Sequence, residues 1–294
     1  MIYVIDASVY VFRAWFSIPD SMIDPEENPV NAMYGFARFL SDFLEYTKPK
    51  YVAVTFDESL KSCFRNDIYP PYKANRDPAP PELKQQFARC RQVTRALGLP
   101  DFAAETYEAD DLIGTIVTSM RADGLPATII SRDKDLLQLL QEPDVMWDYA
   151  GNKRTGYHDV ANKHGVHPEQ MVDYLALAGD SVDNIPGVKG VGPKTAAALL
   201  DHFETFDNIY ERLDEVESLN IRGAKTLGAK LANHKDDALV SRKLTKIHCE
   251  VPIATTRESF IRTAPDMDAL TDVYDTANFG AMLRRQAERI TDQF

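Results

Sequence analysis

Three short apolar runs, each ending in an aspartate, constrain the fold of this 294-residue chain most strongly. They are rich in β-branched residues and cover residues 2–6, 51–57 and 127–133. Helical-looking stretches separate them, a pattern typical of buried parallel strands. We therefore predict an α/β fold with a mostly parallel central sheet flanked by helices. Because ligands in such folds bind beyond the carboxyl ends of the strands, we expect the three aspartates to lie at one site.

Further carboxylates gather at three places along the chain. Residues 107–114 place three acids at the start of a predicted helix, residues 133–135 carry two, and residues 180–183 carry two more. For any single acid, helix capping or a favourable helix dipole is the alternative explanation. Capping accounts poorly for the whole set, which comprises Asp6, Asp57, Glu108, Asp110, Asp111, Asp133, Asp135, Asp180 and Asp183.

If these carboxylates converge, they require cations, because like charges raise each other's pKa. No His or Cys stands at a useful spacing, and oxygen-only ligands select a hard cation such as Mg²⁺, or Mn²⁺ in its place. More acids than one ion needs implies two or more ions. A pair of ions about 3.5–4 Å apart is the arrangement that supports phosphodiester hydrolysis. A single general acid–base pair would leave most of the acids unexplained.

The net charge of −12 argues against nucleic-acid binding, but the distribution of charge does not. Residues 61–95 carry eight Lys/Arg against three Asp/Glu, and residues 222–246 carry seven against two. The first segment also bears aromatic residues and five prolines between positions 70 and 81, which disfavour a regular helix there. Charge combined with stacking suits a single strand. The alternatives are a surface loop and solvated helix faces.

A glycine-rich run at residues 187–194, Gly-Val-Lys-Gly-Val-Gly-Pro-Lys, follows the last two acids directly. It is typical of a tight hairpin that opens a helix, where free backbone N–H groups can bind a phosphate. The sequence therefore places carboxylates suited to a metal next to a loop suited to a nucleic-acid backbone.

Six motifs in this order carry a resemblance to a known family: residues 5–8, 55–57, 72–76, 108–111, 133–136 and 179–188. Together they resemble the 5′-nuclease (flap endonuclease) superfamily, and in particular the 5′→3′ exonuclease domain of bacterial DNA polymerase I and its stand-alone relatives. The resemblance implies a PIN-like fold with a helical arch at about 61–95, beneath which a 5′ single strand threads, and a helix–hairpin–helix region. It also implies a structure-selective DNA nuclease of replication or repair that acts on 5′ flaps, nicks and free 5′ ends.

The same resemblance implies roles for the acids. One metal site would comprise Asp6, Asp57, Glu108 and Asp110. A second site would share Asp110 and add Asp133, Asp135 and Asp180. Asp111 and Asp183 would support the ions through water. We expect the duplex anchor and the cutting site to be coupled, because the hairpin lies a few residues from these acids.

The resemblance further implies contacts with DNA. In the arch, Tyr72, Lys73 and Arg76 would steer phosphates, with Lys73 and Arg76 assisting catalysis, and Arg13 and Arg65 fall on other basic positions. The hairpin would bind duplex through Lys189, Val191, Gly192, Pro193, Lys194, Thr195 and Ala196. There a K⁺ ion would be held by the backbone carbonyls of Leu177, Ala178, Pro186, Val188 and Val191.

We expect three regions: a catalytic α/β domain over residues 1–166, a helix–hairpin–helix domain over 167–262, and closing helices over 263–294. No basic leader or membrane-length apolar run is visible, and the three scattered cysteines indicate a reducing compartment, so we expect a cytoplasmic monomer. Any DNA polymerase partner is expected to act in trans. Two alternatives remain open: a catalytically weak flap-binding protein of the same fold, and an RNA-directed nuclease with the same site.

Overall fold

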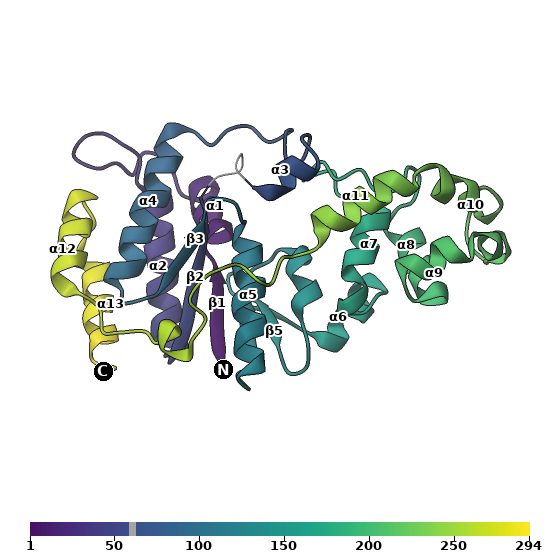
Figure 1. Ribbon diagram of the computed structural model, residues 1–294. Coiled ribbons are helices and arrows are strands. Elements are labelled where there is room, and N and C mark those ends of the chain that lie inside the picture. The colour runs from purple at the N-terminus through teal and green to yellow at the C-terminus, as the bar shows by residue number, and fades with distance from the viewer. Residues whose placement is uncertain (59–62) are drawn as a thin grey trace.

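The computed structural model describes residues 1–58 and 63–294 and has an α/β part joined to a smaller helical part (Figure 1). A six-stranded sheet of order β3-β2-β1-β4-β5-β6 forms the centre of the first part. All neighbouring strands are parallel except β5 and β6. The strands are β1 Ile2–Asp6, β2 Tyr51–Asp57, β3 Asp101–Ala104, β4 Ala127–Ile130, β5 Val145–Asp148 and β6 Lys153–Gly156. The predicted fold class is therefore confirmed.

The register places the strand-end acids at one edge of the sheet. Asp6 is paired with Thr55, two residues before Asp57, and Ile5 is paired with Ile130. The third predicted strand is shorter than expected, since β4 ends at Ile130 and Asp133 instead precedes the 3₁₀ helix η1, Lys134–Leu139.

Two apolar cores cover the two faces of the sheet. On one face α1, α2 and α4 pack with the closing helices α12 and α13 in a single cluster. On the other face the cluster runs from β1 and α5 through η1 into the helical part. The helices concerned are α1 Ala7–Ser17, α2 Asn31–Thr47, α4 Pro81–Ala96, α5 Ala109–Ala122, α12 Met267–Thr276 and α13 Ala281–Thr291.

The helical part shares its core with the sheet. Val160, Met171 and Leu199 belong to the same buried cluster as Ile2 and Val4. This continuity fixes the helical part relative to the sheet edge. Its elements are α6 Tyr157–His164, η2 Pro168–Gln170, α7 Met171–Ala178, α8 Pro193–Phe203, α9 Phe206–Glu211, η3 Leu213–Ser218, α10 Ala224–Asn233 and α11 Lys235–Thr245, and η4 Arg257–Phe260 lies on the return to the sheet.

The connection between α7 and α8 is a compact hairpin. Asp180 and Ile185 exchange both backbone hydrogen bonds, at 3.0 and 2.7 Å, and the Val188 N–H donates to the Leu177 carbonyl at 2.9 Å. Gly187 has a φ of +60°, and a Cβ there would lie 2.4 Å from the Gly179 nitrogen. Only glycine lets the two backbones approach so closely. The hairpin is thereby fixed to the end of α7.

The segment above the upper ends of the strands is shorter than the arch predicted at about 61–95. It contains α3, Phe64–Ile68, followed by turns up to α4 (Figure 1). From Leu83 onward, α4 packs into the core against α2 and belongs to the body of the domain. Residues 63–80 therefore form the part that extends over the carboxyl ends of the strands, and we call them the overhang. Lys61, at the start of the predicted arch, lies outside the described residues. No helix in the described ranges is long and apolar enough to cross a membrane.

Candidate active site

The acids predicted from the sequence face a common region at the carboxyl edge of the sheet. Asp57 raises the pKa of Asp6, Asp133 and Asp6 raise that of Asp110, and Asp133 raises that of Asp135, each in addition to burial. Such mutual effects require the carboxyl groups to lie near one another. They come from the ends of β1 and β2, the start of α5, η1 and the 180–183 loop.

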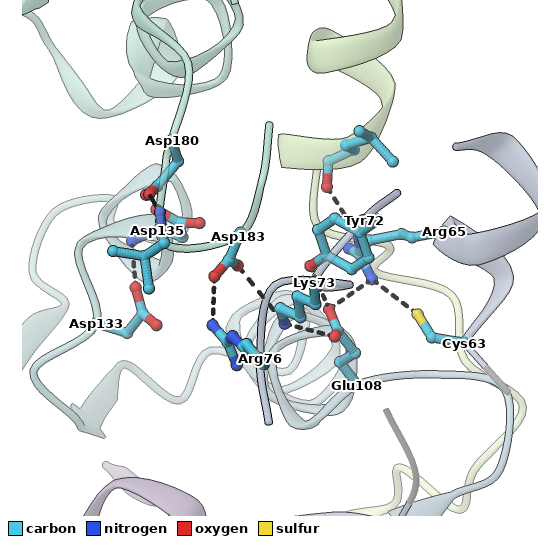
Figure 2. Close-up of polar contacts among 12 residues, drawn as sticks. Cys63, Arg65, Tyr72, Lys73, Arg76, Glu108, Asp133, Asp135, Asp180 and Asp183 are labelled. Carbon is cyan, nitrogen blue, oxygen red and sulfur yellow. Dashed lines mark hydrogen bonds and ion pairs between the residues drawn. The ribbon is translucent and has the colours of Figure 1, made fainter. Parts of the chain in front are cut away.

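Figure 2 shows how part of this region is laid out. Asp133, Asp135 and Asp180 lie on one side, Glu108, Arg65 and Tyr72 on the other, and Asp183, Lys73 and Arg76 between them.

Within the described residues, one group of acids forms no ion pair with lysine or arginine, and the charges of Lys73 and Lys134 act on Asp110 and Asp135 only through space. Burial and the neighbouring Asp57 raise the pKa of Asp6 to about 7, and burial and Asp133 raise the pKa of Asp135 to about 7. Burial, together with Asp133 and Asp6, also raises the pKa of Asp110 well above its usual value. Within the described residues, Asp110 has no hydrogen bond or ion pair, and the buried Oδ1 of Asp135 has no hydrogen-bond partner. We call Asp6, Asp110 and Asp135 the unpaired acids.

Glu108 has the opposite environment. Its Oε1 accepts from the Lys73 ammonium at 2.5 Å, and its Oε2 accepts from the Tyr72 hydroxyl at 2.9 Å and lies 3.3 Å from Arg65. Burial alone would raise the pKa of Glu108, but Lys73 and Arg65 outweigh it and lower the pKa. Glu108 is therefore ionised and balanced by the protein's own cations.

Asp111 lies behind the site and is fully occupied by protein donors. Its two oxygens accept two bonds from the Arg65 guanidinium, both at 2.7 Å, one from the His248 N–H at 2.8 Å and one from the Glu108 N–H at 3.1 Å. These four bonds use the acceptor capacity of a carboxylate. In this structure protein donors therefore occupy both oxygens of Asp111, and its support of a metal through water stays a prediction.

Arg65 is also occupied by protein partners. It is 2% exposed and binds Asp111, Glu108 and the Leu244 carbonyl. Its contact with Leu244 lies 179 positions away in the chain, a relation that no local pattern reveals. Arg65 is the internal counter-ion of Glu108 and Asp111 in this structure, and its contact with DNA stays a prediction.

Two further acids are paired with lysine or arginine. Asp183 accepts from Arg76 and lies 3.6 Å from the Lys73 ammonium. The Lys134 ammonium lies 2.6 Å from Asp180. Burial alone would raise the pKa of Asp180, but the hydrogen bond from Lys134 lowers it. We call Glu108, Asp111, Asp180 and Asp183 the paired acids.

Asp57 and Asp133 are held by neutral donors. The carboxylate of Asp57 accepts from the Ser8 hydroxyl at 2.7 Å and from the Ala109 N–H at 2.8 Å, while Asp133 caps η1 by accepting from the Asp135 N–H at 2.9 Å. The Ser131 hydroxyl similarly donates to Asp6 at 2.8 Å. Sequence reasoning missed Ser8, Ser131 and Lys134. The local signal is that each serine lies two residues from one of the predicted acids, Ser8 from Asp6 and Ser131 from Asp133.

The predicted DNA contacts fall into two sets. Tyr72 is 4% exposed, and its hydroxyl and Lys73 both face Glu108, while the Arg76 side chain is 37% exposed. Arg13, Lys189, Pro193 and Lys194 are exposed and Gly192 and Thr195 are half-buried, whereas Val191 and Ala196 are buried and can offer only backbone atoms.

The five residues whose carbonyls are expected around K⁺ lie at the end of α7 and in the hairpin that follows it. Leu177 and Ala178 end α7, Val191 precedes the N-cap of α8, and Pro186 and Val188 lie between them. The carbonyls of Leu177 and Val188 already accept from Val188 and Val191, both at 2.9 Å. Each retains a second lone pair for a cation.

The chemistry of the unpaired acids fits divalent cations. All the donors are carboxylate oxygens, and an orphaned buried oxygen such as Asp135 Oδ1 is a position at which an ion would restore the balance of charge. As they stand, no three acidic, His or Cys side chains among residues 1–58 and 63–294 are arranged to hold an ion. Lysine or arginine already binds oxygens of the paired acids.

A parallel α/β sheet with an acid-rich carboxyl edge and an attached hairpin is the architecture of a resolvase-like nuclease. Residues 1–165 match the family described as 5′-3′ exonuclease, N-terminal resolvase-like domain, and residues 166–268 match 5′-3′ exonuclease, C-terminal SAM fold. The chain belongs to the 5′-3′ exonuclease family.

Relatives agree with this assignment. The 5′-3′ exonuclease of Aquifex aeolicus is 34% identical over 269 residues, covering 92% of this chain and 89% of that protein. That of Buchnera aphidicola subsp. Schizaphis graminum is 35% identical over 258 residues, covering 87% and 89%. The DNA polymerase I of Rhizobium leguminosarum is 37% identical over 294 residues, covering 98% of this chain, which spans only 28% of that polymerase.

Solved structures share the fold. The T5 D15 protein co-crystallized with metal ions superposes with a TM-score of 0.70 at 19% identity, covering 99% of this chain and 98% of that one. The catalytic core of Rad2 in complex with DNA substrate gives a TM-score of 0.66 at 16% identity, covering 98% and 90%. The solved structures show the fold that this chain shares, and the named relatives place it among the 5′-3′ exonucleases.

Proposed function

We propose that this chain is a Mg²⁺-dependent, structure-selective 5′ nuclease that hydrolyses DNA phosphodiester bonds with two divalent cations. The observation that carries the proposal is the cluster of unpaired acids, which form no ion pair with the described lysines and arginines and whose pKa values are raised by burial and by neighbouring carboxylates. Perturbed carboxylates at a ligand-binding sheet edge favour a catalytic role. Mn²⁺ is expected to substitute for Mg²⁺.

Each acid then has a specific task. The first ion would be held by Asp6, Asp57, Glu108 and Asp110, and the second by Asp110, Asp133, Asp135 and Asp180, with Asp183 acting through water. Bound there, the ions would lower the pKa of the attacking water and offset charge on the leaving oxygen. Ser8 and Ser131 orient Asp57 and Asp6 through the hydrogen bonds described above.

Lys73 and Arg76 are positioned to act on the scissile phosphate. Both face Asp183, and Lys73 also faces Glu108, so they already lie at the acid cluster without DNA. A phosphate entering the cluster would offer these cations new oxygens. We propose that they transfer part of their contact from carboxylate to phosphate and stabilise its developing charge.

The hairpin is proposed to anchor the duplex, without reading sequence, through exposed Lys189 and Lys194 and the backbone at residues 191–196. K⁺ at the five carbonyls would add a contact to a phosphate. Preferred substrates would be DNA with 5′ flaps, nicks or free 5′ ends, with Arg13 contributing from α1. We further propose a cytoplasmic monomer, a domain division at residues 166/167, and a DNA polymerase acting in trans.

Cleavage of end-labelled 5′-flap, nicked and blunt DNA tests the proposal, with Mg²⁺ and K⁺ varied independently. We expect Mg²⁺-dependent release of 5′ products, and binding without cleavage in chelator. Asp110→Asn should keep flap binding and lose at least about 10³-fold in cleavage rate, while Asp292→Asn at the exposed C-terminus should have no effect. Full cleavage by Asp110→Asn would contradict the metal assignment. Equal cleavage of matched RNA flaps would contradict selectivity for DNA.

A further inference from the structure

The turn that carries Lys73 and Arg76 is joined to the loop that carries Asp180 and Asp183 by contacts that involve no catalytic side chain. The Asn75 amide donates to the Ser181 carbonyl at 3.0 Å, and the Asn184 amide donates to the Pro71 carbonyl at 2.7 Å. Both bonds cross between segments more than 100 positions apart in the sequence. They therefore connect the overhang to the entrance of the hairpin.

Backbone and apolar contacts also join residues 71–76 to residues 181–185, and we call this interface the seam. The Lys73 N–H donates to the Asp183 carbonyl at 3.0 Å. Tyr72 packs with Ile185 and Leu244 in a small buried cluster. The turn is thus held on both its polar and its apolar side.

The seam also fixes two unusual backbone conformations. Lys73 has a φ of +54° and Asn184 a φ of +56°, both in the left-handed region. Asparagine tolerates this region, whereas for lysine it is costly and persists only where surrounding contacts enforce it. The direction of the Lys73 side chain toward Glu108 therefore depends on the contacts that hold its backbone.

In the proposed mechanism the ion pairs across the seam weaken during the reaction. Asp183 binds Lys73 and Arg76 here, yet in the proposed mechanism it supports a metal while both cations contact phosphate. Asn75 and Asn184 bind backbone carbonyls, so their bonds remain when the charges are redistributed. Amide-to-carbonyl bonds are also insensitive to salt, unlike exposed ion pairs.

We propose that Asn75 and Asn184 form an amide latch, a pair of positioning residues that hold Lys73 in its active direction while the ion pairs exchange. The latch connects the hairpin that anchors the duplex to the cation that meets the scissile phosphate. This proposal rests on the role proposed above for Lys73.

The test uses the full chain carrying Asn75→Ala and Asn184→Gly together. Glycine keeps the left-handed conformation and removes only the amide. The matched control is Asn278→Gly, an exposed residue with a φ of +55° in the turn between α12 and α13. Hydrogen–deuterium exchange in metal-free protein is followed in peptides covering residues 72–76, alongside the melting temperature and the steady-state kinetics on a 5′-flap DNA with Mg²⁺.

We expect exchange at residues 72–76 to rise at least about tenfold in the double variant, with a melting temperature matching that of the control. The kcat should fall at least about tenfold, with KM changed by less than about threefold. The triple variant that also carries Lys73→Met should have a kcat only slightly below that of Lys73→Met alone, because the effects of coupled residues are non-additive.

Unchanged exchange at residues 72–76 would overturn the latch, as would a kcat loss that adds fully to that of Lys73→Met. A fall in kcat together with a melting temperature clearly below that of the Asn278→Gly control would mean general destabilisation and would also overturn the latch. Hydrogen–deuterium exchange is measured without metal or DNA, so it tests the latch even if the wild type cleaves no flap DNA. A wild type that cleaves no flap DNA would contradict the proposed function and leave the latch standing.

Discussion

Two neighbouring carboxylates at the start of α5 have opposite environments. Asp111 is completely buried and receives four protein hydrogen bonds, two of them from Arg65. Asp110 has no hydrogen bond or ion pair from any described residue. The same division runs through the whole site, between the paired acids and the unpaired acids. Asp111, whose oxygens are occupied by protein donors, needs no cation from solution, whereas Asp110 has no ion pair and is left for a cation from solution.

The largest expected effect comes from removing the cation of the paired acids. Arg65→Met would leave Glu108 and Asp111 buried without their guanidinium partner. Breaking a buried pair by removing one partner costs about 3–5 kcal/mol. Chemical denaturation should therefore show a loss of that size. The control Arg38→Met breaks an exposed pair on α2 and should change stability by less than about 0.5 kcal/mol. Equal losses in the two variants would mean that the pairing of Glu108 and Asp111 has no special weight.

The unpaired acids predict an unusual pH dependence in the metal-free protein. Burial and neighbouring aspartates raise the pKa of Asp6 and of Asp135 to about 7, against about 3.9 in the unfolded chain. Between these values the folded chain binds more protons than the unfolded chain, so stability falls as pH rises from about 4 to 7. At about 1.4 kcal/mol per pKa unit, the loss should be on the order of 4 kcal/mol for each of these two acids in chelator.

Mg²⁺ should abolish this decline, since bound cations favour the ionised acids. Thermal melts from pH 5 to 8, with and without Mg²⁺, measure both effects, and Asp6→Asn should flatten the chelator profile. A stability that rises across this range in chelator would contradict the raised pKa values.

The smallest expected effects come from turning paired acids into unpaired ones. Lys73→Met releases Glu108 and Asp183 from a largely buried ammonium and should tighten Mg²⁺ binding about tenfold, although cleavage becomes slower. Lys134→Met releases Asp180 from a side chain that is 44% exposed, so the gain should be only about threefold. Calorimetric Mg²⁺ titration measures both, with the exposed Lys163→Met as control. Weaker Mg²⁺ binding in either variant would show that these lysines assemble the site and do not compete for it.

Much of the sheet could be predicted from the sequence, because β1, β2 and β4 are apolar, β-branched and almost wholly buried. β3 and β6 gave no such signal: β3 is Asp-Phe-Ala-Ala and only half-buried, and β6 is an edge strand that begins with Lys153 and Arg154. Short strands of this kind are held by their neighbours and not by their own apolar pattern. The sequence placed the turn segment and α4 in one basic segment, because the buried face of α4 cannot be told from a basic helix face by charge alone.

The acids could be found from residue type and spacing, but their partners could not. Arg65 and Asp111 are 46 positions apart, and Asn75 and Ser181 are 106 apart. Such pairings depend on how the overhang folds back onto α5 and the hairpin loop. The sequence therefore indicated which residues gather at the sheet edge, and only the structure separated the paired acids from the unpaired ones.

Mn²⁺ binding to Asp110→Asn and Asp111→Asn, counted by electron paramagnetic resonance at pH 8 and at a temperature where circular dichroism shows both variants folded, tests this division most directly. Asp110→Asn should lose at least one bound ion relative to the wild type without loss of stability. Asp111→Asn should be less stable and keep the wild-type number of ions. Retained binding in Asp110→Asn together with lost binding in folded Asp111→Asn would contradict the division between paired and unpaired acids.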